Sequence, residues 1–486
     1  MTDAVHSISF LILLIGLLIV AAVVVRALLD RTYVPALVGF IGLGFLLRLA
    51  NDNFGILSKD GEFAFDVLAE LGIIVLLFRV GLESDLAGLR RQLGSASIVW
   101  LGNIVLSAVP GYFVMSWLLG YDQIPSLIAA VALTATSIGV SVGMWRQHDA
   151  LGTPKGQLLT DVAEMDDLSG LALMVLLFAV VPILHDTDAA TRGSGAGAEI
   201  TSTVMPGAES AASSGGRTGE RSGDGSETRS AGVSGEGRPG AGGNGSGDEG
   251  AQGDSSGGIW SKLLITGGLL LFKFAAFAAL CTAFARYVES PMTHAFERYA
   301  TRPEMIVFVA GIGISIAGVA AWLGFSAVVG ALFAGLAFSR DPDSVKFDTG
   351  FTGLYQLFAP FFFIGIGLSL DTSAFTSALG VGAALAAVAV IGKVVGAGLP
   401  ALIATGATGA ALIGVSMVPR AEITMIIMER GQQLGDWAVL PELYAAFVLV
   451  SAITCTVAPV SLEFMFRRWP NQIGRSPKSQ SREKPE

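Results

Sequence analysis

Two adjacent carboxylates, Asp166 and Asp167, lie within the apolar stretch LLTDVAEMDDLSGLALMVLLFAVV, which covers residues 158–181. A charged side chain at bilayer depth costs at least about 2.5–3.5 kcal/mol on insertion scales. Such groups therefore usually face a hydrated path lined by protein, where they handle protons or cations. Like charges held this close couple their titrations, and a carboxylate cannot hold both a proton and a cation well. This competition predicts exchange of H+ for a monovalent metal cation bound by Asp166 and Asp167.

The two carboxylates cannot share one face of a helix, because neighbouring helix positions point about 100° apart. Both can border one cavity at a helix corner, or one can bind while the other forms an ion pair. Asp161 and Glu164 add two acids one turn earlier. The alternative is that the pair marks a helix end at the membrane interface, but the apolar run around it favours an intramembrane position.

Lys393 is the second charged residue in an apolar setting, within ALAAVAVIGKVVGAGLPAL at residues 384–402. A lone ammonium at that depth needs a counterion, and one of the paired aspartates is the natural candidate. The alternative is a lysine whose long side chain reaches the membrane interface.

Pro419, Arg420 and Glu422 form a third cluster, in IGVSMVPRAEITMII at residues 413–427. Proline interrupts the hydrogen-bond ladder of a helix. Arg420 and Glu422 flank the break, where charges and freed backbone groups can satisfy each other. The sequence therefore predicts an interrupted helix at this position.

A counterpart lies in the first half of the chain, where Thr134, Thr136 and Ser137 occur in the sequence LTATSIG. Their hydroxyls can support an unwound crossing, or they can simply bond to the backbone of their own helix. One interrupted helix in each half indicates a binding site near the membrane midplane.

The composition is that of a membrane protein, with 52% apolar residues, 14% charged residues and a mean hydropathy of +0.64. A helix needs about 20 apolar residues to cross about 30 Å of hydrocarbon. We therefore expect an all-α polytopic membrane protein with thirteen transmembrane helices, near residues 7–29, 33–48, 64–82, 95–119, 125–144, 157–184, 260–287, 303–321, 325–338, 352–370, 376–403, 406–430 and 440–466.

The remaining charge and cysteine content excludes other classes of site. The net charge of −10 lies largely in loops and intramembrane acids, so it does not indicate a nucleic-acid partner. Cys281 and Cys455 lie in apolar runs and are interpreted as small hydrophobic residues rather than a disulfide. No His/Cys cluster has metal-ligand spacing, and we expect no cofactor.

Lys and Arg concentrate in alternate loops, which predicts the orientation of the chain. With the N-terminus outside, the inner loops hold Arg26, Arg31, Arg79, Arg90, Arg91, Arg146, Lys155, Arg286, Arg298, Arg302, Arg340 and Lys346. The tail at 467–486 adds six more basic residues. We expect an integral protein of a prokaryotic cytoplasmic membrane, with its N-terminus outside and its C-terminus inside.

Residues 185–259 interrupt the membrane pattern, because they are rich in Gly and Ser and contain no Leu, Phe, Tyr or Trp. We interpret this segment as a disordered low-complexity outer loop, either without function or with a regulatory one. It separates a first membrane repeat at 1–184 from a linker helix at 260–287 and a second repeat at 288–466. Helices seven positions apart run in opposite directions, as inverted repeats require.

Seven stretches together resemble the monovalent cation:proton antiporter-2 family, which has the sodium/proton antiporter fold. They are LAELGIIVLLFRVGLESDL (68–86), LTATSIGVSVG (133–143), EMDDLSGLALM (164–174), LGFSAVVGALFAGLAFS (323–339), LFAPFFFIGIGLSLD (357–371), IGKVVGAG (391–398) and MVPRAEI (417–423).

The resemblance implies a homodimer with two crossed discontinuous helices. Helices 1–3 and 8–10 would form a dimerisation domain, helices 4–6 and 11–13 a moving core, and helix 7 the linker. Asp167 would carry the ion or proton, and Asp166 would form a salt bridge with Lys393. Thr136 and Ser137 would lie at the unwound crossing. Arg420 and Glu422 would form a structural pair.

An Asp-Asp pair with a membrane lysine resembles the electrogenic branch of the family, which exchanges Na+ or Li+ for more than one H+. Electroneutral relatives tend to carry Asn-Asp at these positions. Asp161 and Glu164 depart from the pattern, because more apolar residues are expected there. They could line an inner funnel.

We therefore predict a secondary antiporter, not an enzyme, that works by an elevator-type movement of the core. The main alternative is an electroneutral or K+-selective exchanger. A channel would need a selectivity filter such as TVGYG, and an intramembrane aspartyl protease would place its aspartates on different helices. A carrier of organic anions would need basic groups at its site.

Overall fold

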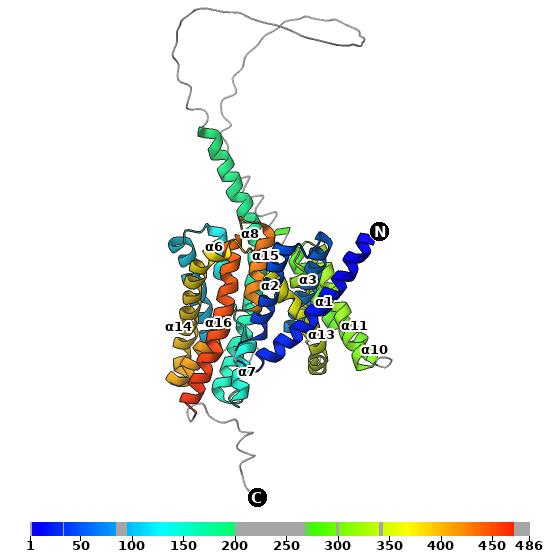
Figure 1. The fold of residues 1–486 in the computed structure, drawn as a ribbon. Coiled ribbons are helices and arrows are strands. Elements are labelled where there is room, and N and C mark those ends of the chain that lie inside the picture. Colours follow the sequence, from blue (N-terminus) through cyan, green and yellow to red (C-terminus); the bar gives the residue numbers. More distant parts are fainter. Residues whose placement is uncertain are drawn as a thin grey trace, which may run out of the picture. The chain divides into compact units, whose positions relative to one another are not determined.

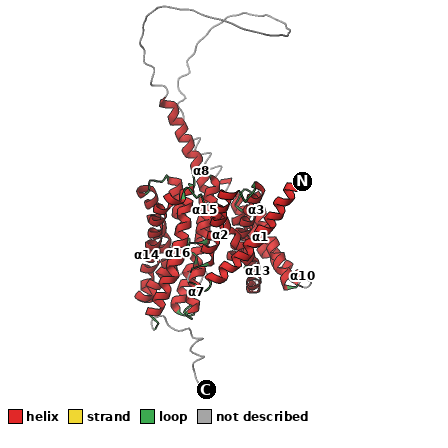
Figure 2. Cartoon of the chain, in the orientation of Figure 1, coloured by secondary structure: helices red, strands yellow, loops and turns green. Residues whose placement is uncertain are grey.

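The computed structural model describes residues 2–32, 34–83, 95–199, 268–269, 272–297, 301–339 and 344–470. The described residues form helices joined by short turns and contain no strand, as Figure 2 shows. Residues up to Leu184 and from Gly267 onward make up one compact unit, and His185–Thr266 make up a second. In the second unit, the described residues are 185–199, which belong to the last part of helix α8 (Pro154–Glu199).

Most helices of the first unit belong to one of two packing groups (Figure 1). The first helix group contains α1 (Thr2–Leu29), α2 (Ala36–Phe54), α3 (Lys59–Glu83), α11 (Arg302–Trp322), α12 (Ala327–Phe338) and α13 (Ser344–Leu368). The second helix group contains α5 (Ser95–Phe113), α6 (Gln123–Ala132), α7 (Ile138–Gln147), α14 (Phe375–Ser416), α15 (Glu422–Leu434) and α16 (Pro441–Arg468). Hydrogen bonds join α8 to α5 and α14 of the second group. Between the groups, α16 touches α2.

Eight helices of the described residues are long and apolar enough to cross a membrane. These spans are Ile8–Leu29, Ala36–Phe54, Ala96–Leu118, Pro154–Pro182, Glu304–Trp322, Phe351–Leu368, Phe375–Ser416 and Pro441–Arg468. Two shorter apolar helices, Gln123–Ala132 and Ala327–Phe338, accompany them. The chain is therefore an integral membrane protein of the all-helical kind, and the count of thirteen spans stays a prediction.

The outer surface of the helices explains why this sequence needs a bilayer. On α1, the side chains of Ile12, Leu13 and Leu17 are each more than 60% exposed. In water, that much apolar surface would carry a large free-energy cost, whereas hydrocarbon accommodates it.

Several element boundaries differ from those expected from the sequence. The segment expected at 125–144 is split into α6 and α7, and α8 continues past residue 184 to Glu199. No proline follows Pro182 before Glu199 to stop that helix. The segment expected to end at 287 continues through a π-helical turn, η2 (Phe284–Val288), into α10 (Glu289–Glu297). Most of the predicted loop at 185–259 and most of the tail at 467–486 lie outside the described residues.

The long helix α14 contains an abrupt change of direction at Gly406, where φ is 69° and ψ is 178°. Residues with a Cβ essentially never adopt this backbone conformation. Gly406 therefore divides α14 into the two segments that the sequence indicated, near 376–403 and from 406 onward.

The helices α5 and α14 approach each other closely at a pair of glycines, one on each helix. A Cβ added to Gly102 would lie 2.6 Å from the carbonyl oxygen of Gly396, and one added to Gly396 would lie 2.8 Å from that of Gly102. Because these contacts are with backbone atoms, only helix separation could relieve them. The close approach brings Asn103 and Lys393, which neighbour the glycines in sequence, toward the same region.

We expect Gly396→Ala to destabilise the protein by about 1–3 kcal/mol, because the added methyl group pushes α14 away from α5. Thermal unfolding in detergent would measure the loss. Gly380→Ala is the matched control, since it lies on the same helix and its Cβ would meet no atom within 4 Å. Equal melting temperatures for the two variants would contradict this account of the helix contact.

Candidate functional site

The two interrupted helices that the sequence indicates are present, and their breaks contact each other. The first helix is interrupted between Ala132 and Ile138, and the second between Ser416 and Glu422. The backbone N–H of Ser137 donates a hydrogen bond to the carbonyl of Pro419 at 2.8 Å. Two segments almost 300 residues apart are thus joined through their backbones.

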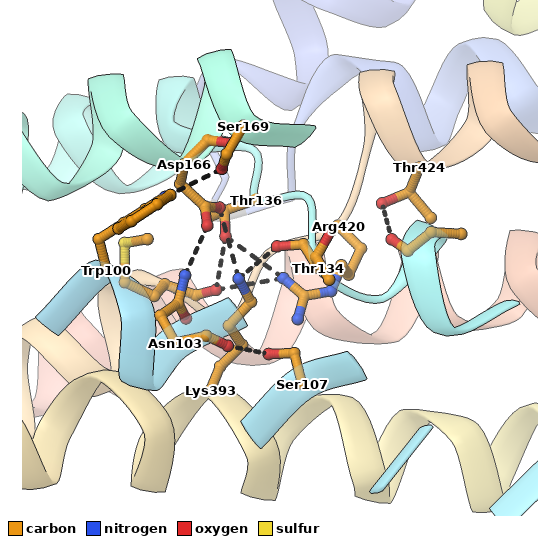
Figure 3. Close-up of polar contacts among 12 residues, drawn as sticks. Trp100, Asn103, Ser107, Thr134, Thr136, Asp166, Ser169, Lys393, Arg420 and Thr424 are labelled. Carbon is orange, nitrogen blue, oxygen red and sulfur yellow. Dashed lines mark hydrogen bonds and ion pairs between the residues drawn. The ribbon is translucent and has the colours of Figure 1, made fainter. Parts of the chain in front are cut away.

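Each interrupted helix provides a hydroxyl that caps the other helix. The Ser141 hydroxyl on α7 donates to the carbonyl of Ser416, the last residue of α14, at 2.6 Å. The Thr424 hydroxyl on α15 donates to the carbonyl of Ala132, the last residue of α6, at 2.9 Å (Figure 3). Carbonyls at a helix end lack an intrahelical partner, so these two bonds satisfy groups that would be costly to bury alone.

A buried cation lies at each of these helix ends. Lys393 Nζ donates to the Thr134 carbonyl at 2.5 Å, just beyond α6. Arg420 Nη1 donates to the Met417 carbonyl at 3.3 Å, just beyond α14. Both side chains are 0% exposed. Because the C-terminal end of a helix carries a partial negative charge, a fixed cation at each end is stabilising.

Asp166 is the buried anion of the same cluster, with 1% exposure. Its Oδ1 accepts a hydrogen bond from Asn103 Nδ2 at 2.6 Å, and its Oδ2 lies 3.4 Å from Lys393 Nζ (Figure 3). The ion pair between Asp166 and Lys393 is therefore formed, with the ammonium shared between Asp166 and the Thr134 carbonyl. Both oxygens of Asp166 are engaged within the protein.

Asp167 is in a different situation from its neighbour on α8. Its side chain is partly exposed, and it forms no hydrogen bond or ion pair with any described residue. Asp161, one to two turns earlier, is also partly exposed. The structure thus distinguishes a buried carboxylate at 166, paired with Lys393, from a partly exposed one at 167 that has no hydrogen bond or ion pair to a described residue.

The predicted hydroxyl residues have different contacts. Thr134 Oγ1 bonds to Val131 of its own helix at 2.7 Å, the local arrangement that the sequence left open. Thr136 Oγ1 instead donates across the break to the Met417 carbonyl at 3.3 Å and accepts from Arg420 Nη1 at 3.4 Å. Ser137 contributes its backbone N–H.

The structure does not bring together Arg420 and Glu422, which the resemblance implied would pair. Arg420 lies within the break and directs its guanidinium at Thr136 and Met417, whereas Glu422 is the first residue of α15. In that position Glu422 can favourably oppose the partial positive charge of the helix start.

Several residues of the site were not identified from the sequence. Asn103 on α5 is the most important, because it holds Asp166 directly. Ser169 Oγ accepts from Trp100 Nε1 at 2.9 Å and donates to the Asp166 carbonyl at 2.9 Å. A buried amide in the middle of the apolar run SIVWLGNIVL was an available signal, because intramembrane polar groups are rare and usually functional.

The site offers few ligands to a multivalent metal ion. Among the described residues, no group of three or more His, Cys, Asp or Glu side chains could hold a metal ion. Cys281 and Cys455 are buried and free, and Cys455 Sγ donates to the Arg420 carbonyl at 3.1 Å.

Comparisons with known proteins show similarity along most of the chain. The model of the sodium/hydrogen exchanger family, transmembrane, matches residues 18–207 and 255–468. The high-affinity Na+/H+ antiporter NhaS3 of Synechocystis is 24% identical over 85% of this chain and 73% of its own length. The Na+/H+-K+ antiporter GerN of Bacillus cereus is 24% identical over 82% of each chain.

A solved structure supports the same fold. The sodium proton antiporter MjNhaP1 of Methanocaldococcus jannaschii superposes with a TM-score of 0.59 at 12% sequence identity, covering 96% of this chain and 100% of that one. With the family model matching well over half of its residues, the chain belongs to the sodium/hydrogen exchanger family of transmembrane proteins.

Proposed function

We propose that this chain is a secondary antiporter that exchanges H+ for a monovalent cation, with Asp167 as the shared carrier. The observation that carries the proposal is the uncommitted carboxylate of Asp167 beside a fully engaged Asp166. A group without a protein partner is free to bind a proton and a cation in turn. The relatives named Na+/H+ antiporters support transport rather than catalysis.

Backbone groups at the helix breaks would complete the cation site. Monovalent cations are bound in transporters by unwound carbonyls together with carboxylates. Asp166, Thr136 and Ser137 lie at or beside the breaks, and the Asp166–Lys393 pair would respond to a change of charge on Asp167. Asp161 and Glu164, earlier on α8, would line an approach to the site from the cytoplasm.

Alternating access would result from movement of the second helix group, with α8, against the first group. The packing supports this division, because each group is internally connected and the site lies within the second group and α8. The first group would then be the dimerisation domain and the second the core, with residues 260–287 as the linker. Differential stabilisation of two core positions is sufficient for such a mechanism.

The reciprocal caps also support the proposed inverted repeats. In each repeat, the second half of the interrupted helix caps the end of the first half of its counterpart. A pseudo-twofold relation between α6–α7 and α14–α15 would produce this reciprocity. Thirteen spans, repeats at 1–184 and 288–466, an outside N-terminus and a cytoplasmic tail complete the proposed topology.

For the transported cation we favour Na+ or Li+, with net charge movement, because an Asp-Asp pair with a membrane lysine resembles the electrogenic branch of the family. A K+-selective or electroneutral exchanger is the second candidate, and the Na+/H+-K+ antiporter name of the Bacillus cereus relative supports keeping it.

Currents from proteoliposomes on a solid-supported membrane would decide between these candidates. We expect transient currents after jumps in Na+ or Li+ concentration and none after K+ jumps. Electrically silent exchange that runs with K+ would instead support the second candidate. A protein that exchanges no cation for H+ under any of these conditions would contradict antiport itself.

We expect Asp167→Asn to abolish exchange, because the amide can neither release a proton nor neutralise a bound cation. Dequenching of a pH-sensitive dye in proteoliposomes would report the loss, and size-exclusion chromatography would show that the fold is retained. Asp371→Asn is the control, since Asp371 is a loop carboxylate that accepts hydrogen bonds from Ser373. Exchange by Asp167→Asn at a rate near that of wild type would refute the site assignment.

We expect Lys393→Ala to lower stability by about 3–5 kcal/mol, because it leaves the Asp166 carboxylate buried without its counterion. Thermal unfolding in detergent would measure the change. The double variant Asp166→Asn with Lys393→Ala removes both charges and should recover part of the lost stability. An unchanged melting temperature in the single variant would count against a stabilising ion pair.

A further inference from the structure

An ion pair connects the two helix groups at a distance from the candidate site. Arg430 Nη2 on α15 donates to both carboxylate oxygens of Glu70 on α3, at 2.7 and 2.6 Å. The two side chains are 16% and 33% exposed, respectively, so the pair is partly shielded from solvent. Contact of one nitrogen with both carboxylate oxygens is a charge-assisted arrangement, stronger than a neutral hydrogen bond.

A cavity with both polar and apolar lining residues lies beside this pair. It has a volume of about 420 Å³ and lies where α3 and α13 meet α15, and its lining includes Asp66, Glu70, Ser369, Glu429 and Gln433. Within the second group, Arg430 Nη1 donates to Gln433 Oε1 at 2.7 Å, and the Tyr444 hydroxyl donates to Glu429 at 2.6 Å. Glu429 and Gln433 on α15 thus have hydrogen-bond partners within their own helix group. Arg430 has one partner there and a second, Glu70, in the other group.

The helix α15 links this pair mechanically to the candidate site. It begins at Glu422, beside the break that contacts Ser137, and Arg430 lies eight residues later. At 1.5 Å per residue, the two positions are about 12 Å apart along one rigid helix. A translation of the break relative to α3 therefore also moves Arg430 relative to Glu70.

We infer that Glu70 and Arg430 form a latch between the two helix groups, which must open each time the core changes position. This inference rests on the proposed function, because it assumes that the groups move relative to each other. The latch stabilises the arrangement seen here and contributes nothing to the other arrangement. It thereby sets the balance between the two without contacting the transported ion.

Reversible crosslinking provides the direct test. In Glu70→Cys/Arg430→Cys, a bis-methanethiosulfonate reagent would tie α3 to α15, and dithiothreitol would release them. The native cysteines are both buried and would react little. We expect crosslinking to stop cation/proton exchange and reduction to restore it.

The matched control is Arg48→Cys/Asp52→Cys, which replaces an ion pair within α2 alone. Crosslinking there should leave exchange unchanged. Continued exchange by Glu70→Cys/Arg430→Cys after complete crosslinking, verified by mass spectrometry, would overturn the latch and leave antiport intact. If neither wild type nor the double-cysteine variant exchanged cations for protons before the reagent was added, the proposed function would be overturned and the latch with it.

A double-variant cycle tests the ion pair itself. We expect Glu70→Gln and Arg430→Gln each to change the initial exchange rate by about two- to fivefold, the size expected for a partly exposed pair. The combination should change it by about the same factor, because either variant alone already opens the latch.

Two further variants serve as controls for the cycle. Gln433→Ala removes a contact of Arg430 within α15 and should have a much smaller effect, whereas Glu70→Arg/Arg430→Glu should move the rate back toward wild type. If the combined Glu70→Gln/Arg430→Gln variant changed the exchange rate by the product of the two single factors, the two residues would act independently. That result would refute the latch.

Discussion

The structure depends on hydrogen bonds to the backbone groups at the ends of its two interrupted helices, because these groups lie in an apolar interior. At the breaks after Ala132 and Ser416, water is largely excluded, so unpaired carbonyls would cost several kcal/mol each. The protein satisfies them with hydroxyls from Ser141 and Thr424 and with cations from Lys393 and Arg420. The crossing is stable because each half supplies what the other lacks.

This solution determines the charge distribution of the site. Asp166 compensates the charge of Lys393 while Asn103 fixes its position, and Arg420 is held by the Met417 carbonyl and the Thr136 hydroxyl. Asp167 is then left as a carboxyl group with no hydrogen bond or ion pair to any described residue. A framework held by hydrogen bonds and one ion pair, with one uncommitted carboxylate beside it, suits a group that must exchange ligands.

Much of the candidate site could be predicted from the sequence, because polar residues are rare in membrane-spanning segments and each one can be recognised by itself. Asp166, Asp167, Lys393 and the break at Pro419 were identifiable in that way. The partners of Arg420 were not, because the family resemblance implied Glu422, whereas the fold turns the guanidinium toward Thr136. The pairing of Asn103 with Asp166, and that of Glu70 with Arg430, depend on contacts between distant helices, which no local pattern encodes.

Competition between a proton and a cation for one site is the central claim, and calorimetry of cation binding tests it most directly. Titrating Na+ into the purified protein in two buffers of different protonation enthalpy gives the number of protons released per cation bound. We predict release of about half a proton per cation at the pH where Asp167 is half protonated, rising toward about one at lower pH, because both ligands compete for the same carboxylate. Cation binding without any proton release would contradict it.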